Sequence, residues 1–186
     1  MENLSGDGVK VTCDSFQSQE GGAIPTSPLQ FIISLTDYRT FKKYNELWHS
    51  RLPKIGGFYV RGLFFKAEFN GQIYAVAGWS EPIARMLSKK NYFELRRFAI
   101  SPGCPKNTAT RIMCIMTKII RKLKPELVKL ISYQDTDVHS GTIYKASGWK
   151  AAHKSKPNDM NWVVTHKRKI SNYQTFASKI RWELDL

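Results

Sequence analysis

A long amphipathic helix between two apolar strands is the feature that most constrains the fold of this chain. Over residues 107–123 the apolar side chains recur at helical spacing and form one stripe. The flanking segments, NYFELRRFAIS and LVKLISY, have the length and composition of strands. Strands and helices that alternate in this way indicate an α/β protein. The stripe consists of Ala109, Ile112, Met113, Met116, Ile119, Ile120 and Leu123.

The remaining segments extend this pattern to one domain with a mixed sheet flanked by helices, residues 29–186. Residues 1–28 are rich in Gly, Ser and Pro without periodicity, which predicts a flexible or irregular N-terminal arm. In chain order, the other predicted elements are a strand at 29–35, a helix at 37–51 capped by Thr36 or Asp37, a hairpin turning at Asn70-Gly71, a short helix at 140–149, and two basic strands around Ala151 and Trp162.

The net charge of +14 is distributed unevenly along the chain. Residues 1–28 contain one Lys and four acidic residues, a net charge of −3, which leaves +17 on residues 29–186. A domain this basic attracts polyanions, and nucleic acid is the first expectation. The alternative is a charge that serves solubility alone.

The composition favours the cytoplasm as the location of the protein. No apolar run approaches the roughly 20 residues of a membrane span, and the N-terminus lacks the basic and apolar regions of a signal peptide. Cys13, Cys104 and Cys114 are too few and too irregularly spaced for a disulfide framework or a zinc site. We therefore expect no membrane contact.

Acidic and phenolic side chains gather directly after the strand LVKLISY. Asp135 and Asp137 follow this strand, and Tyr144 falls on the first turn of the short helix. In α/β sheets the strand ends present reacting groups to ligands, so these residues are candidates for catalysis. The alternatives are helix capping by a carboxylate and ordinary packing of the tyrosine.

Arg97 and His49 are weaker candidates. Strict alternation along NYFELRRFAIS places Arg97 on the same face as Phe93, Leu95 and Ala99. An arginine on an apolar face requires a partner or a ligand. His49 lies at the end of the first predicted helix, where an isolated histidine is most often half-exposed and without a function.

The turn before the long helix is a candidate anion-binding site. Backbone N–H groups and the positive end of a helix dipole attract anions there. The alternative is ordinary helix capping. The residues that such a site would use are Lys106, Asn107, Thr108 and Thr110.

Four short motifs follow one another along the second half of the chain. They are E-L-x-R at Glu94-Leu95-Arg97, P-[KR]-N at Pro105-Lys106-Asn107, S-Y-x-D at Ser132-Tyr133-Asp135, and the block H-x-G-T-I-Y-x-A-[ST]-x-[WF] from His139 to Trp149. Together they resemble the motifs of the Mom family of bacteriophage DNA-modification proteins. Ser50 departs from the family, which commonly has a tyrosine after the histidine at position 49.

The resemblance implies a fold like that of the GCN5-related N-acetyltransferases, the GNAT fold, in which the two central strands are neighbours and separate at their C-terminal ends around a cleft. It also implies an enzyme that converts adenine in DNA to N6-(carbamoylmethyl)adenine and thereby protects phage DNA from host restriction. The implied donor is acetyl-CoA or another source of a two-carbon unit. Iron is a further implied cofactor, held by His49 and Asp135.

For this reaction we expect Asp135 and Tyr144 to act nearest the chemistry, with Ser132 and Arg97 in support. The donor is expected at Lys106, Asn107, Thr108 and Thr110.

The DNA substrate sets further expectations. The target adenine of double-stranded DNA must leave the helix, because its N6 edge is base-paired, and Tyr133 or Trp79 is expected to flank it. The mouth of the cleft is expected to be lined by Lys150–Lys156, Lys167–Lys169 and Arg181.

Two other functions remain open from the sequence. An ordinary GNAT acyltransferase that uses acyl-CoA usually carries a glycine-rich pyrophosphate loop, whereas residues 106–110 here read KNTAT. A DNA-binding module without catalytic activity has no use for Asp135 and Asp137, which repel phosphates.

Overall fold

A computed structural model describes residues 24–50, 53–55, 62–157 and 177–186 of the 186-residue chain. Within these residues, seven strands form one sheet in the order β1-β2-β3-β4-β5-β7-β6. Every neighbouring pair is antiparallel except β4 and β5, which are parallel. The predicted mixed sheet is therefore confirmed. The strands are β1 (Ile32–Thr36), β2 (Leu63–Phe69), β3 (Gln72–Ser80), β4 (Tyr92–Ile100), β5 (Lys129–Asp135), β6 (Lys150–Lys154) and β7 (Lys179–Asp185).

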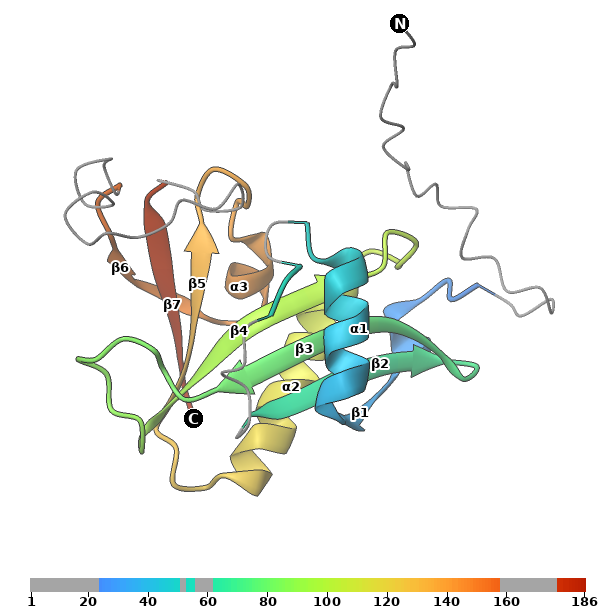
Figure 1. Cartoon of the computed structure of the whole chain (residues 1–186), viewed down its shortest axis with the longest axis horizontal. Coiled ribbons are helices and arrows are strands. Elements are labelled where there is room, and N and C mark those ends of the chain that lie inside the picture. Colours follow the sequence, from blue (N-terminus) through green and yellow to red (C-terminus); the bar gives the residue numbers. More distant parts are fainter. Residues whose placement is uncertain (1–23, 51–52, 56–61, 158–176) are drawn as a thin grey trace, which may run out of the picture.

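Helices cover both faces of the sheet (Figure 1). Helix α1 (Tyr38–Trp48) packs on β2, β3 and β4, and the longer α2 (Thr108–Leu123) lies on the opposite face. The short α3 (Thr142–Ala146) follows β5, and a 3-10 helix, η2 (Pro28–Gln30), precedes β1. The apolar stripe of α2 explains its position, because Ile112, Met113, Met116 and Ile120 are buried.

Local sequence signals account for the element boundaries. Asp37 caps α1 by accepting a hydrogen bond from the Thr40 backbone N–H at 2.9 Å, as predicted. The hairpin between β2 and β3 turns at Asn70 and Gly71, whose φ angles of 48° and 77° belong to the primed turns that fit strand twist. The predicted strand at 29–35 begins later, at Ile32, because η2 occupies the residues before it.

A β-bulge at Arg96 shows that the predicted alternation along β4, which placed Arg97 on one face with Phe93, Leu95 and Ala99, is wrong. Gly78 pairs with Arg97 and Trp79 pairs with Leu95, so Arg96 is an extra residue in β4. An extra residue reverses the alternation beyond it. Phe93 and Leu95 face the main core with α2, whereas Ala99 packs with Phe41 of α1 on the other face.

The strand β7 was not predicted from the sequence. It inserts between β5 and β6 and hydrogen-bonds to both, so its partners come from distant parts of the chain. The predicted strand around Ala151 is confirmed as β6, while the one around Trp162 lies outside the described residues. None of the helices in the described ranges combines the length and hydropathy that a membrane span requires.

Candidate functional site

The strands β4 and β5 separate around a cavity, as predicted. Their pairing runs only from Tyr92 and Lys129 to Leu95 and Ser132, although both strands continue beyond. The bulge at Arg96 comes directly after the last paired residue of β4 and bends the strand there. A cavity of about 1000 Å³ opens between the separated ends.

Five of the predicted site residues line this cavity. His49 comes from the end of α1, Arg97 from β4, Ser132 and Asp135 from β5, and Tyr144 from α3. The sequence places these residues up to 95 positions apart, and the separation of β4 from β5 brings them together.

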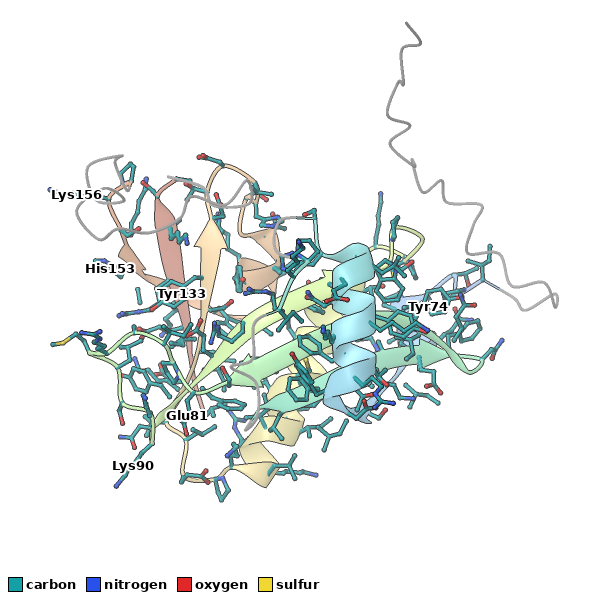
Figure 2. All side chains as sticks on the ribbon, in the orientation of Figure 1. Tyr74, Glu81, Lys90, Tyr133, His153 and Lys156 are labelled. Carbon is teal, nitrogen blue, oxygen red and sulfur yellow. The ribbon has the colours of Figure 1, made fainter. Side chains whose placement is uncertain are left out.

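The aromatic side chains predicted to flank the base divide between the cavity and the core. Tyr133 lines the cavity, and Figure 2 shows it on β5. Trp79 is fully buried in the core, where its ring stacks on Phe93 and its Nε1 lies 3.4 Å from Met116 Sδ. The prediction for Trp79 is therefore wrong.

Ser132 and Tyr144 form a buried hydroxyl pair in the wall of the cavity. Ser132 Oγ lies 2.9 Å from the Tyr144 hydroxyl and 3.2 Å from the Leu95 carbonyl oxygen. Because the carbonyl can only accept, Ser132 donates to Leu95 and Tyr144 donates to Ser132. Burial raises the pKa of Tyr144, and the hydrogen bond to Ser132 opposes this only in part. Tyr144 is therefore a protonated phenol at neutral pH.

Two tryptophans and Gln134 orient Tyr144. Its ring stacks on Trp182 of β7 at 5.3 Å between centroids and meets Trp149 edge-on at 5.7 Å. Trp182 Nε1 donates to Gln134 Oε1 at 2.7 Å, and Gln134 Nε2 donates in turn to the His139 carbonyl oxygen. These contacts hold α3 against the end of β5.

Asp135 is positioned by a tight turn at the end of β5. Its Oδ1 accepts a hydrogen bond from the Asp137 backbone N–H at 3.1 Å, and its carbonyl oxygen accepts from the N–H groups of Val138 and His139. Asp137 is exposed and does not line the cavity. The structure thus separates the two carboxylates, with Asp135 in the cavity wall and Asp137 in the turn.

Burial keeps His49 neutral. Its pKa falls from 6.5 to about 4, because burial disfavours the imidazolium and the positive charges of Arg97 and His139 add to the effect. Between pH 6.5 and about pH 4, the unfolded chain binds a proton at His49 that the folded chain does not. The resulting contribution to stability is complete above pH 6.5 and is lost as the pH falls toward 4.

We therefore expect His49→Gln to flatten the pH dependence of stability. The free energy of unfolding of the wild-type protein should fall more steeply than that of the variant as the pH falls from 6.5 to about 4. Urea unfolding of both proteins across this window measures the difference. Parallel declines of the two would contradict the assignment.

The described residues do not form a complete iron site. His49 and Asp135 line the same cavity, but in the described part of the chain no three His, Cys, Asp or Glu side chains are grouped closely enough to hold a metal ion. Non-haem iron sites commonly use three protein ligands. No step is therefore assigned to iron.

Glu94 is a cavity residue that the sequence analysis did not select. It lines the same cavity with only 7% of its surface exposed. Its carboxylate pairs with Arg96 Nε at 3.2 Å and accepts a hydrogen bond from the Ile83 backbone N–H at 3.2 Å. Burial raises the pKa of Glu94, while Arg96, Ile83 and Arg97 lower it by less. The sequence signal that could have identified Glu94 is its place in the E-L-x-R motif.

The predicted anion-binding turn lies at the edge of the cavity. Ala109 of the first turn of α2 lines the cavity, whereas Lys106, Asn107, Thr108 and Thr110 do not. Asn107 has a left-handed backbone with φ 65° and makes no side-chain cap. Thr108 is buried, and its hydroxyl donates to the Pro105 carbonyl oxygen at 2.7 Å, so that hydroxyl is already used within the turn.

Of the basic segments predicted at the cleft mouth, only part can be placed. Lys150–Lys156 covers the exposed strand β6, and Figure 2 shows His153 and Lys156 at the outer edge of the sheet. Arg181 lies on β7 beside Glu183, with 2.8 Å between Nε and Oε1, and does not line the cavity. Lys167–Lys169 lies outside the described residues.

Solved structures of acetyltransferases share this fold. The acetyltransferase of Bacillus subtilis in complex with CoA has a TM-score of 0.59 and 14% identity, and the match covers 84% of this chain and 99% of that chain. An IAA acetyltransferase from Bacillus cereus has a TM-score of 0.59 and 16% identity, and the match covers 84% of this chain and 99% of that chain. A GNAT family acetyltransferase from Elizabethkingia anophelis with acetyl-CoA bound has a TM-score of 0.57 and 14% identity, with the same two coverages of 84% and 99%.

The sequence comparisons identify the family. No match was found among curated protein sequences. The model of the Mom protein family matches residues 42–184, which is more than half of the chain and includes β4, β5 and α3. The chain therefore belongs to the Mom protein family and has the GNAT fold.

Proposed function

We propose that this protein transfers a two-carbon unit to the N6 amine of adenine in double-stranded DNA, giving N6-(carbamoylmethyl)adenine. The observation that carries the proposal is the cavity between β4 and β5, which joins five predicted side chains in a member of the Mom protein family. The charge of +17 on residues 29–186 supports DNA as the substrate. The product protects phage DNA from restriction in the host cytoplasm.

The cavity offers the acid and base that this reaction needs. The N6 amine is a poor nucleophile, because its lone pair is delocalised into the purine ring. As nitrogen bonds to the methylene carbon of the donor, the N6 proton passes to a base and the donor's leaving group departs with its bonding electrons. Asp135 or Glu94 accepts the proton, and Tyr144, whose single hydroxyl proton turns from Ser132 to the leaving group, donates to it. Arg97 supports the developing negative charge.

The proposed donor is a two-carbon unit that already carries the carboxamide and has its leaving group on the methylene carbon. A thioester such as acetyl-CoA reacts at its carbonyl carbon and supplies no amide nitrogen, so it would give the acetylated product instead. The place where the donor binds is inferred from the fold. Two of the structural neighbours hold CoA or acetyl-CoA, and the first turn of α2 reaches the cavity through Ala109. We assign donor binding to Lys106, Asn107 and Thr110 and to the backbone N–H groups of the turn. Thr108 contributes through its backbone, because its hydroxyl is bonded to Pro105.

The size of the cavity is consistent with two ligands. Its volume of about 1000 Å³ lies at the upper end of the roughly 300–1,000 Å³ typical of small-molecule sites. An extruded adenine and the reacting end of a donor require such space, and the exposed ring of Tyr133 is available to stack on the base.

Mass spectrometry of nucleosides from cellular DNA tests the proposal. We expect DNA from cells that express the protein to contain carbamoylmethylated adenine, and DNA from cells that express the double variant Asp135→Asn, Glu94→Gln to lack it. An acetyl group carries one nitrogen fewer than a carbamoylmethyl group, so the exact mass separates the two products. Unmodified DNA in both cultures would contradict the proposal.

An ordinary acyl-CoA-dependent N-acyltransferase is the second candidate, and the solved acetyltransferase structures favour it. It predicts transfer from acetyl-CoA to a small-molecule or protein amine without modified DNA. Release of free CoA on addition of such an amine would identify this activity. A protein that binds DNA and changes neither substrate would be the non-enzymatic module.

A further inference from the structure

The loop that joins β3 to β4 exposes large apolar side chains beside the cavity. Met86 has 96% and Ile83 has 61% of its surface exposed. In Figure 1 this loop, residues 81–91, projects from the sheet on the left, and Figure 2 shows Lys90 pointing outward from it. Single exposed apolar side chains are common on protein surfaces, so the position of this loop beside the cavity is what distinguishes Met86 from the others.

Backbone hydrogen bonds give the loop a defined shape. The Leu87 N–H donates to the Ala84 carbonyl oxygen at 3.1 Å, which closes a turn with Arg85 and Met86 at its corner. At the base, the Ile83 N–H donates to the buried carboxylate of Glu94 at 3.2 Å. The loop is thus anchored to β4 while the corner carries Met86 into solvent.

The position of the loop relates Met86 to the reaction site. Ile83 and Ala84 line the cavity together with Tyr133 and Asp135. Met86 follows two residues after Ala84, at the corner of the turn. The corner therefore follows directly on the part of the loop that lines the cavity, where a duplex that gives up a base to the cavity would have to lie.

The surroundings of Met86 are basic. Residues 81–91 contain Arg85, Lys89 and Lys90 and a single acid, Glu81, for a net charge of +2. A second hollow of about 530 Å³ beside the loop is lined by Lys89, Lys90 and Lys124 together with the acidic Glu81 and Glu126. These cations suit the phosphates on either side of an opened base step.

We propose that Met86 is a wedge that enters the DNA base stack and fills the space left by the extruded adenine, with Arg85, Lys89 and Lys90 on the flanking phosphates. The wedge rests on the proposed function and would explain how the duplex is opened at the target adenine. Apolar wedges of this kind, Met among them, separate base steps in other DNA-binding proteins. A duplex needs such a device, whereas an unpaired adenine does not.

The test compares duplex and single-stranded substrates. Purified full-length protein is incubated with native or heat-denatured genomic DNA, with an extract of non-expressing cells as the source of the donor, and modified adenine is quantified. We expect Met86→Ala to modify duplex DNA about 10- to 100-fold more slowly than wild type and denatured DNA at the wild-type rate. Met86→Leu, which keeps an apolar wedge, should retain the duplex rate. Leu29→Ala, at another exposed apolar position on η2 (71% exposed, against 96% for Met86), serves as the control.

The outcomes separate the wedge from the proposed function. Equal losses on both substrates, or no loss on duplex DNA, would overturn the wedge alone. Modification of neither substrate by the wild-type protein would overturn the proposed function and the wedge with it. A wild-type dimer that Met86→Ala dissociates, seen by size-exclusion chromatography, would instead assign this surface to a second copy of the chain.

Discussion

Replacing Tyr144 with phenylalanine is expected to slow adenine modification by about 10²- to 10⁴-fold. The phenol is the proposed proton donor to the leaving group, and its pKa, raised by burial, keeps the proton in place at neutral pH. The fold should survive, because the ring keeps its contacts with Trp182 and Trp149. Losing one hydrogen bond to Ser132 costs about 1 kcal/mol.

Single-turnover modification of DNA and urea unfolding measure the two effects separately. Tyr74→Phe is a matched control, since Tyr74 is also buried and its hydroxyl also bonds a neighbouring side chain, Gln72, but it lies on β3 away from the cavity. It should change stability by a similar amount and leave the rate unaltered. A Tyr144→Phe variant with full activity would remove the acid role.

The same assay decides which carboxylate accepts the N6 proton. Asp135→Asn and Glu94→Gln each keep the shape and remove the charge. The residue that accepts the proton is the one whose variant modifies adenine much more slowly than the wild-type protein. The affinity of that variant for DNA should stay at the wild-type level. Asp137→Ala should be mild, because Asp137 is exposed in the turn.

Replacing Gly141 with alanine is expected to have the largest effect on stability. Gly141 has φ +75°, and a Cβ there would lie 2.5 Å from Gln134 Oε1 and 2.7 Å from Trp182 Cζ2. The left-handed backbone costs a non-glycine residue about 1–2 kcal/mol, and overpacking adds about 1–3 kcal/mol. Since Trp182 stacks on Tyr144, activity should fall together with stability.

Gly71→Ala separates the two causes of this loss. Gly71 has nearly the same backbone, φ +77°, but a Cβ there meets nothing within 4 Å. It should lose only the conformational term of about 1–2 kcal/mol. Urea unfolding of both variants measures the difference, and equal losses would show that Gln134 and Trp182 move aside at no cost.

The separate behaviour of these variants reflects how the cavity is built. Tyr144→Phe alters chemistry within an intact wall, whereas Gly141→Ala displaces the wall itself. A variant that loses activity but keeps its stability therefore identifies a residue that takes part in the reaction. A variant that loses both identifies a residue that holds the cavity wall in place.

Local patterns in the sequence determined the elements around the site. The apolar stripe of α2, the Asn70-Gly71 turn and the Asp37 cap each follow from interactions within a few residues. Residues His49, Arg97, Ser132, Asp135 and Tyr144 were selected from motifs and strand ends, and all of them line the cavity.

Only the tertiary structure decided the features that depend on distant partners. The bulge at Arg96 arises from pairing with β3, and no alternation pattern within β4 reveals it. The strand β7 is defined by hydrogen bonds to β5 and β6, and its Trp182 supports Tyr144 from 38 residues away. Glu94 is buried because the loop 81–91 folds back onto its carboxylate. Contacts between residues far apart in the chain leave no periodic signal in the sequence, so packing alone determines them.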